Sequence, residues 1–170
     1  MALSDIQLTT LRAACFATPA AAAFFVNPGN AAGLRTYLNT ASSFVVWRTA
    51  VLQDEIMQNG FDWVRVDNLS VGKARIWDWL FDNEGRSINP SKANVRAGIQ
   101  ECWKGTAADL LVQAAVLDHC KRNATNAERL LGSGIGDAAN PGLLSFEGDL
   151  SDVDAARLIY RDNGTVWTEI

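Results

Sequence analysis

The segment from Thr106 to Leu131 constrains the possible fold more than any other part of the sequence. Thr106 is followed three residues later by Asp109, a spacing at which two side chains cap the first turn of a helix reciprocally. Apolar residues then recur at helical intervals until Gly132. They are Ala107, Leu110, Leu111, Ala114, Leu117, Ala124, Ala127 and Leu131. We therefore expect one helix over residues 106–131, about 39 Å long at 1.5 Å per residue, at the centre of a helical bundle.

Capping and turn residues predict shorter helices on both sides of this segment. The expected helices, with the residue that caps or opens each, are 4–17 (Ser4), 30–38 (Asn30), 70–83 (Ser70), 90–104 (Pro90) and 151–161 (Ser151). Residues 52–60 predict one or two further turns, and the alternation over residues 63–67 favours an extended segment. Residues 42–51 have no clean period, so helix and strand both remain open for them. The expected fold class is mainly α.

Length and charge predict one helical domain followed by an acidic arm. A chain of 170 residues, 48% of them hydrophobic, is long enough for one domain with its own core. The net charge of −4 is unevenly distributed, because the segment from Asp137 onward holds seven acids and two bases. We expect a helical domain over residues 1–136 and an acidic C-terminal arm over residues 137–170. A flexible loop over residues 132–142 would lead into the arm, and a short strand-like tail would end it.

The cysteines and the apolar runs indicate a chain without disulfides or a membrane span. Cys15, Cys102 and Cys120 form no CxxC pair and are odd in number, so we expect reduced thiols and neither a zinc site nor a disulfide framework. The longest apolar run, residues 19–26, is far shorter than the ~20 residues that cross a bilayer. We expect a soluble, unexported chain that binds no metal or cofactor.

Two glycine-containing stretches are similar to nucleotide-binding loops but lack their defining residues. Gly72-Lys73 falls outside the GxxxxGK[ST] frame, because Asp67 stands where the first glycine is needed and Ala74 where the hydroxyl is needed. The GSGIG sequence of residues 132–136 follows a predicted helix, whereas a dinucleotide site follows a strand. Neither stretch predicts an enzyme.

Three pairs of acids are candidates for catalytic carboxylates. They are Asp54 with Glu55, Asp78 with Asp82, and Asp152 with Asp154. Helix surfaces and helix N-termini account for them more simply, because acids there interact well with the helix dipole. We therefore expect no active site, and a protein that is not an enzyme.

The only histidine, His119, lies in a basic stretch of the predicted 106–131 helix. His119, Arg122 and Arg129 recur at helical spacing, with Lys121 beside them. This stripe predicts a contact face for an acidic partner or a phosphate backbone. A solvated face, with Asp118 pairing with Arg122 four residues on, is the simpler interpretation.

Six tryptophans are interleaved with arginines, a pattern typical of protein interfaces and of single-stranded nucleic-acid binding. Residues 35–104 hold nine cations and eight anions, a balance that favours a protein partner. The candidate interface residues are Trp79, Arg75, Trp47, Trp63 and Trp167.

Helical geometry separates the two tryptophans of the predicted 70–83 helix. At about 100° per residue, Trp77 and Trp79 point about 200° apart. Trp77 shares its side with Ala74 and Phe81, which indicates the core. Trp79 lies with Gly72, Arg75 and Asp82, which indicates an outward tryptophan suited to a docking contact.

Two long stretches resemble a known family. SSFVVWRTAVLQDEIMQNGFDWVRVDNLSVGKARIWDWLF (residues 42–81) and INPSKANVRAGIQECWKGTAADLLVQAAVLDHCKR (residues 88–122) are similar to the head-tail adaptor (connector, head completion) proteins of tailed bacteriophages. The likeness extends from Ser42 to about Arg129. It is one of sequence texture, because this family has no catalytic signature.

The resemblance implies a mostly helical subunit of a ring, expected to be a dodecamer, beneath the portal protein in the neck of the virion. The implied partners are further copies of the chain, the portal protein, a tail terminator or other neck protein, and DNA that passes without sequence recognition. An arm over residues 145–170 would dock on neighbouring rings, and the interface aromatics would include Trp79. The chain would reside in the host cytoplasm during assembly and would have no membrane contact.

Two other functions remain open from the sequence. The first is a different neck or tail component, such as a tail terminator. The second is a small nucleic-acid-binding module that uses His119, Lys121, Arg122 and Arg129.

Overall fold

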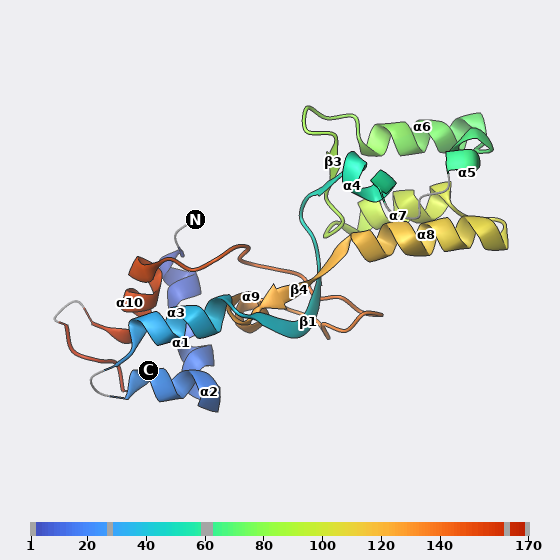
Figure 1. Ribbon diagram of the computed structural model, residues 1–170. Helices are drawn as coiled ribbons and strands as arrows, with labels where there is room; N and C mark the ends of the chain where they lie inside the picture. The colour runs from blue at the N-terminus through green and yellow to red at the C-terminus, as the bar shows by residue number, and fades with distance from the viewer. Residues whose placement is uncertain (1–2, 27–28, 59–62, 162–163, 169–170) are drawn as a thin grey trace. The chain divides into compact units, whose positions relative to one another are not determined.

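The computed structural model describes residues 3–26, 29–58, 63–161 and 164–168, apart from the side chains of Gln58 and Trp63. These residues are mainly helical, as the sequence predicts (Figure 1). The chain forms two compact units, one of Met1–Val46 with Asn123–Ile170 and the other of Trp47–Arg122. The domain boundary expected at residue 137 falls inside the first unit.

The first unit consists of the two ends of the chain. Its helices are α1 (Asp5–Ala17), α2 (Pro19–Ala22), the 3-10 helix η1 (Ala23–Phe25), α3 (Ala31–Asn39), α9 (Asn126–Leu131) and α10 (Asp152–Ile159). α1 packs against α9 and α10, and α3 packs against α10. Leucines at helical spacing on α1 and α3 are buried in the core, which Leu158 and Ile159 of α10 complete.

The acidic C-terminal segment belongs to this core. Phe146 and Leu150 are buried with the leucines of α1 and α3, and the buried Asp154 carboxylate accepts a hydrogen bond from the Leu3 amide at 3.3 Å. The excess of acids predicts an arm because a count of charges includes exposed acids such as Asp149. Such a count takes no account of the apolar residues between the acids. The expected strand-like tail is represented by one antiparallel bridge between Tyr160 and Val166, and residues 169–170 lie outside the described residues.

The second unit is the middle of the chain. Its elements are β2 (Val51–Leu52), α4 (Gln53–Gln58), α5 (Trp63–Asp67), α6 (Val71–Leu80), β3 (Ser87–Ile88), α7 (Ala93–Cys102) and α8 (Ala107–His119). β2 and β3 are antiparallel, with Val51 opposite Ile88. α7 packs against both α6 and α8, and the buried rings of Trp77 and Trp103 meet edge-on at a centroid distance of 5.4 Å.

The predicted helix over residues 106–131 is wrong, because three elements share this segment. α8 ends at His119, β4 (Lys121–Thr125) pairs with β1 (Ala41–Trp47), and α9 follows. Thr125 starts α9 with a capping box of its own, since its hydroxyl accepts from the Glu128 amide and the Glu128 carboxylate accepts from the Thr125 amide at 2.8 Å. The apolar spacing continues past the break because Ala124 of β4 and Ala127 of α9 are both buried.

Most of the predicted caps are confirmed. Ser4, Asn30, Ser70, Thr106 and Ser151 each accept a hydrogen bond from a first-turn backbone amide. The Thr106 box also lowers the pKa of Asp109, chiefly through the hydrogen bond from the Thr106 backbone amide. A cap therefore locates the start of a helix reliably.

Three other segments were not predicted correctly or fully from the sequence. Residues 42–51, which the sequence left open, hold most of strand β1 and the first residue of β2. The extended segment predicted over residues 63–67 is instead the short helix α5. α7 begins at Ala93, later than the expected start at Pro90.

The glycine-rich loop after α9 is held in place by Phe44 of β1. A Cβ atom on Gly136, whose φ is +75°, would lie 1.9 Å from the Phe44 ring, and one on Gly142 would lie 2.5 Å from it. The backbones are joined as well, because Val45 donates to Gly136 at 2.7 Å and accepts from Gly142 at 2.8 Å. The loop, expected to be flexible, is thus closely packed in the first unit.

Among the described residues, no single helix is long and apolar enough to cross a bilayer. Asp5–Ala17 and Pro19–Phe25 together reach the length and apolar composition of a membrane span, but the chain bends by 102° between them.

Candidate functional site

The outer side of α6 is the most prominent exposed apolar feature that the sequence singled out. Ser70 caps the helix, and Trp77 is turned into the core with 2% of its surface exposed, whereas Trp79 is 65% exposed. Gly72, Arg75, Trp79 and Asp82 follow one another at helical spacing and are all exposed. We call these four residues the α6 face. The predicted opposite orientation of the two tryptophans is confirmed.

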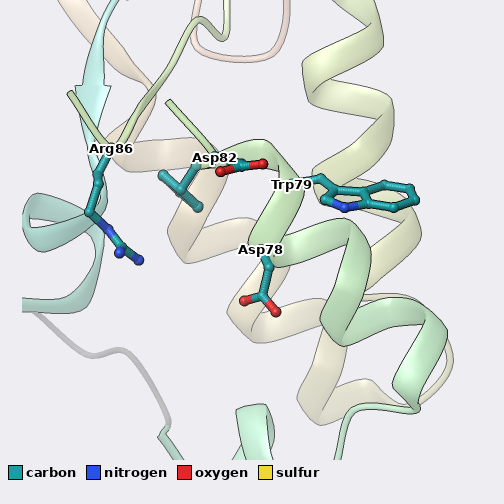
Figure 2. A pocket seen from close by; sticks show the side chains of 5 residues that line it. Asp78, Trp79, Asp82 and Arg86 are labelled. Atoms are coloured by element: carbon teal, nitrogen blue, oxygen red, sulfur yellow. The ribbon is translucent and has the colours of Figure 1, made fainter. Parts of the chain in front are cut away.

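A hollow of about 380 Å³ adjoins the α6 face. It is lined by Asp78, Trp79, Phe81, Asp82 and Arg86. Figure 2 shows Trp79 and Arg86 on opposite sides of the two acids. Arg86 is itself held, because its Nε donates to Oε1 of the buried Gln53 at 2.6 Å. These groups can hold polar or charged atoms of a partner, but they include no nucleophile with an adjacent base.

α8 carries a second exposed stripe on the same unit. Ala107, Leu111, Ala114 and Asp118 are exposed at helical spacing, and Leu111 is 73% exposed. We call these residues the α8 face. A hollow of about 540 Å³ runs beside its C-terminal half, lined by Gln113, Ala114, Ala115, Leu117, Asp118 and Lys121. The second unit therefore presents a bulky aromatic on one helix, and on another helix alanines on either side of one exposed leucine.

Trp47, another tryptophan predicted at the interface, is engaged within the second unit. Trp47 is half-buried in the second unit, with the Arg96 guanidinium 4.8 Å and the Lys121 ammonium 5.7 Å from its ring centroid. Trp63 begins α5, and its side chain lies outside the described residues. Cation-π contacts of this kind stabilise the unit that contains them, so Trp47 is a structural residue in this conformation.

Trp167 is likewise occupied within the first unit. The guanidinium carbons of Arg12 and Arg161 lie 4.0 Å and 4.6 Å from its ring centroid. Arg12 also donates to the Arg157 carbonyl at 2.8 Å, and burial, followed by the charge of Arg157, lowers the pKa of Arg12. These contacts join the C-terminal tail to α1.

The basic stripe predicted on one helix is not formed as such. His119 ends α8, Lys121 and Arg122 lie on β4, and Arg129 lies on α9. Consecutive strand residues point to opposite faces, so Lys121 and Arg122 do not share one. The stripe depended on the continuous helix, and the break at Cys120 removes it.

The three cysteine thiols are buried inside the fold. Cys15, Cys102 and Cys120 are free and buried, and burial raises their pKa to about 12, 11 and 12.

Asp54 with Glu55 and Asp152 with Asp154 lie in the first turns of α4 and α10, as predicted. Asp78 and Asp82 differ, because they lie at the C-terminal end of α6, where the helix dipole disfavours acids. Within the described residues, no three His, Cys, Asp or Glu side chains could hold a metal ion.

Comparisons of this chain with protein-family models, with curated proteins and with solved structures find no match. The α6 and α8 faces both belong to the second unit.

Proposed function

We propose that this protein is a structural neck component of a tailed bacteriophage. In this proposal it is a head-tail adaptor whose copies form a ring, expected to be a dodecamer, beneath the portal protein. The ring links the DNA-filled head to the tail. The observation that carries the proposal is the exposed Trp79 beside Arg75 on a helix whose opposite side buries Trp77.

An exposed tryptophan of this kind is best explained by a protein contact. Trp and Arg are the residues most enriched among interface hot spots. A ring subunit needs two different, complementary surfaces so that each copy contacts the next and the series closes. The α6 and α8 faces supply two different exposed surfaces on one unit.

The exposed acids of the C-terminal segment suit a neck protein. Asp137, Asp149 and Asp152 are exposed in the first unit. Carboxylates on a channel wall repel DNA and let it slide past, and carboxylates at a ring surface attract a basic partner such as a portal protein. Either placement agrees with the proposed role.

Electron microscopy of the purified full chain, alone and mixed with the portal protein of the same phage, tests the proposal. We expect rings of the chain, or portal particles with additional density at one end. A chain that remains monomeric and leaves the portal undecorated would overturn the proposal.

A further inference from the structure

We infer that the α6 face of one copy packs antiparallel against the α8 face of a second copy, with Trp79 over Ala114 and Arg75 paired with Asp118. This inference rests on the proposed function in one respect, namely that copies of the chain contact one another head to tail. It specifies the surfaces through which they do so.

The shapes of the two faces are complementary. Trp79 projects from α6 with most of its ring in solvent. The α8 face has alanines at positions 107 and 114, and the hollow of about 540 Å³ lies beside Ala114 and Asp118. Small residues allow a large side chain to approach a helix closely, so an indole fits here as a knob into a hole.

The spacing of the charges sets the direction of packing. Arg75 and Trp79 are four residues apart on α6, and Ala114 and Asp118 are four residues apart on α8, which is about 6 Å in each case. Antiparallel helices place Arg75 on Asp118 and Trp79 on Ala114 at the same time. Neither Arg75 nor Asp118 forms an ion pair within the part of the chain that the structure describes.

The helix dipoles favour the same direction. Asp78 and Asp82 lie at the C-terminal end of α6, where their own helix disfavours them. In this register Asp82 lies opposite Leu111, just past the first turn of the partner's α8, and Arg75 lies opposite Asp118 at the negative C-terminal end of that helix. Arg75 thus gains a favourable neighbour that its own helix does not provide.

The occupant of each face is a second copy because the two faces are complementary in shape and charge and are both exposed on the same unit. α6 and α8 of one copy both pack against α7, and their outer faces point into solvent. The two faces differ in shape and charge, so the contact is heterologous and repeats from copy to copy. A closed ring is one product of such a contact.

Charge reversal tests the pairing. Arg75→Asp and Asp118→Arg should each weaken self-association about tenfold or more in sedimentation velocity, because each places like charges opposite one another. The double variant should recover most of the affinity. Lys92→Asp, which reverses the charge of an exposed residue outside both faces, is the control and should leave association unchanged.

Disulfide trapping tests the contact itself. An equimolar mixture of Trp79→Cys and Ala114→Cys should give a linked pair of chains, because removal of the indole lets the two Cβ atoms approach to disulfide distance. The three native thiols are buried and do not compete. A mixture of Trp79→Cys with Ile6→Cys, an exposed residue of the first unit, is the control and should give no specific product.

The outcomes separate this inference from the proposed function. Rings or portal decoration without rescue by the double variant and without the trapped pair would overturn the inference and leave the neck role standing. Trapping only between two Trp79→Cys chains would indicate a symmetric α6 contact and would also overturn it. Rescue and trapping without portal decoration would support the inference and count against the neck role.

Discussion

Trp77 and Trp79, two residues apart on α6, lie on opposite sides of the helix, with exposed fractions of 2% and 65%. Trp77 packs edge-on against Trp103 and Phe81, at centroid distances of 5.4 Å and 5.0 Å. Trp79 projects beside Arg75 and Asp82. One residue type therefore serves the core at one position and is available to a partner at the other.

Alanine substitutions at these two positions should affect different properties, namely self-association at Trp79 and folding stability at Trp77. Trp79→Ala should weaken self-association by about 2 kcal/mol or more and leave the free energy of unfolding nearly unchanged. Trp77→Ala should lower the free energy of unfolding by about 3–5 kcal/mol, because it empties a close-packed site. Sedimentation velocity and urea unfolding measure the two quantities. Loss of folding in Trp79→Ala would show that this side chain belongs to the core.

The orientation of these tryptophans could be predicted because it depends on local geometry alone. A cap such as Ser70 sets where the helix starts, and the helical repeat then sets which side chains share a side. Asn30 and Ser151 predicted α3 and α10 in the same way. These features need no knowledge of the rest of the chain.

The features that could not be predicted depend on contacts between distant segments. The strand β4 interrupts the predicted long helix because it pairs with β1, about eighty residues earlier in the chain. The capping box of Thr125 and Glu128 was a local sign of that break, and the continuing apolar period concealed it. Trp47 and Trp167 look like interface residues in the sequence, and only the fold places cations over their rings.

The packing of Phe44 against Gly136 predicts a large effect of a single methyl group. Gly136→Ala should lower the free energy of unfolding by about 2 kcal/mol or more, because it adds a clash with the ring to backbone strain at φ +75°. Gly148→Ala is the matched control, since Gly148 also has a positive φ but has nothing within 4 Å of the added Cβ. Equal losses in urea unfolding would contradict the clash, and Phe44→Leu should partly restore Gly136→Ala.

The buried thiols predict a loss of stability in alkaline solution. In the folded chain the pKa of Cys15 and Cys120 is raised to about 12 and that of Cys102 to about 11, whereas an unburied thiol ionises near pH 9. Above about pH 9 the unfolded state releases protons that the folded state keeps, so the free energy of unfolding falls as pH rises. Each thiol contributes a slope of about 1.4 kcal/mol per pH unit until its folded pKa is reached.

Urea unfolding over a pH series measures this slope. Cys120→Ala should reduce it by about one thiol's share, even though the substitution also lowers stability at neutral pH by leaving a small cavity. Wild-type and Cys120→Ala chains with parallel pH dependences would show that the thiol does not ionise on unfolding in this range.

DNA retention distinguishes a neck protein from a nucleic-acid-binding module. The four basic residues that the sequence predicts on one helix lie on α8, β4 and α9. Lys121 lies near the Trp47 ring, and the net charge is −4. We therefore expect weak retention of the chain on double-stranded DNA, with little dependence on salt. Each phosphate neutralised would add about −0.9 to the log-log salt slope. A steep slope that Arg122→Ala and Arg129→Ala both reduce would favour the nucleic-acid-binding module, whereas a flat response in wild-type and variant chains would count against it.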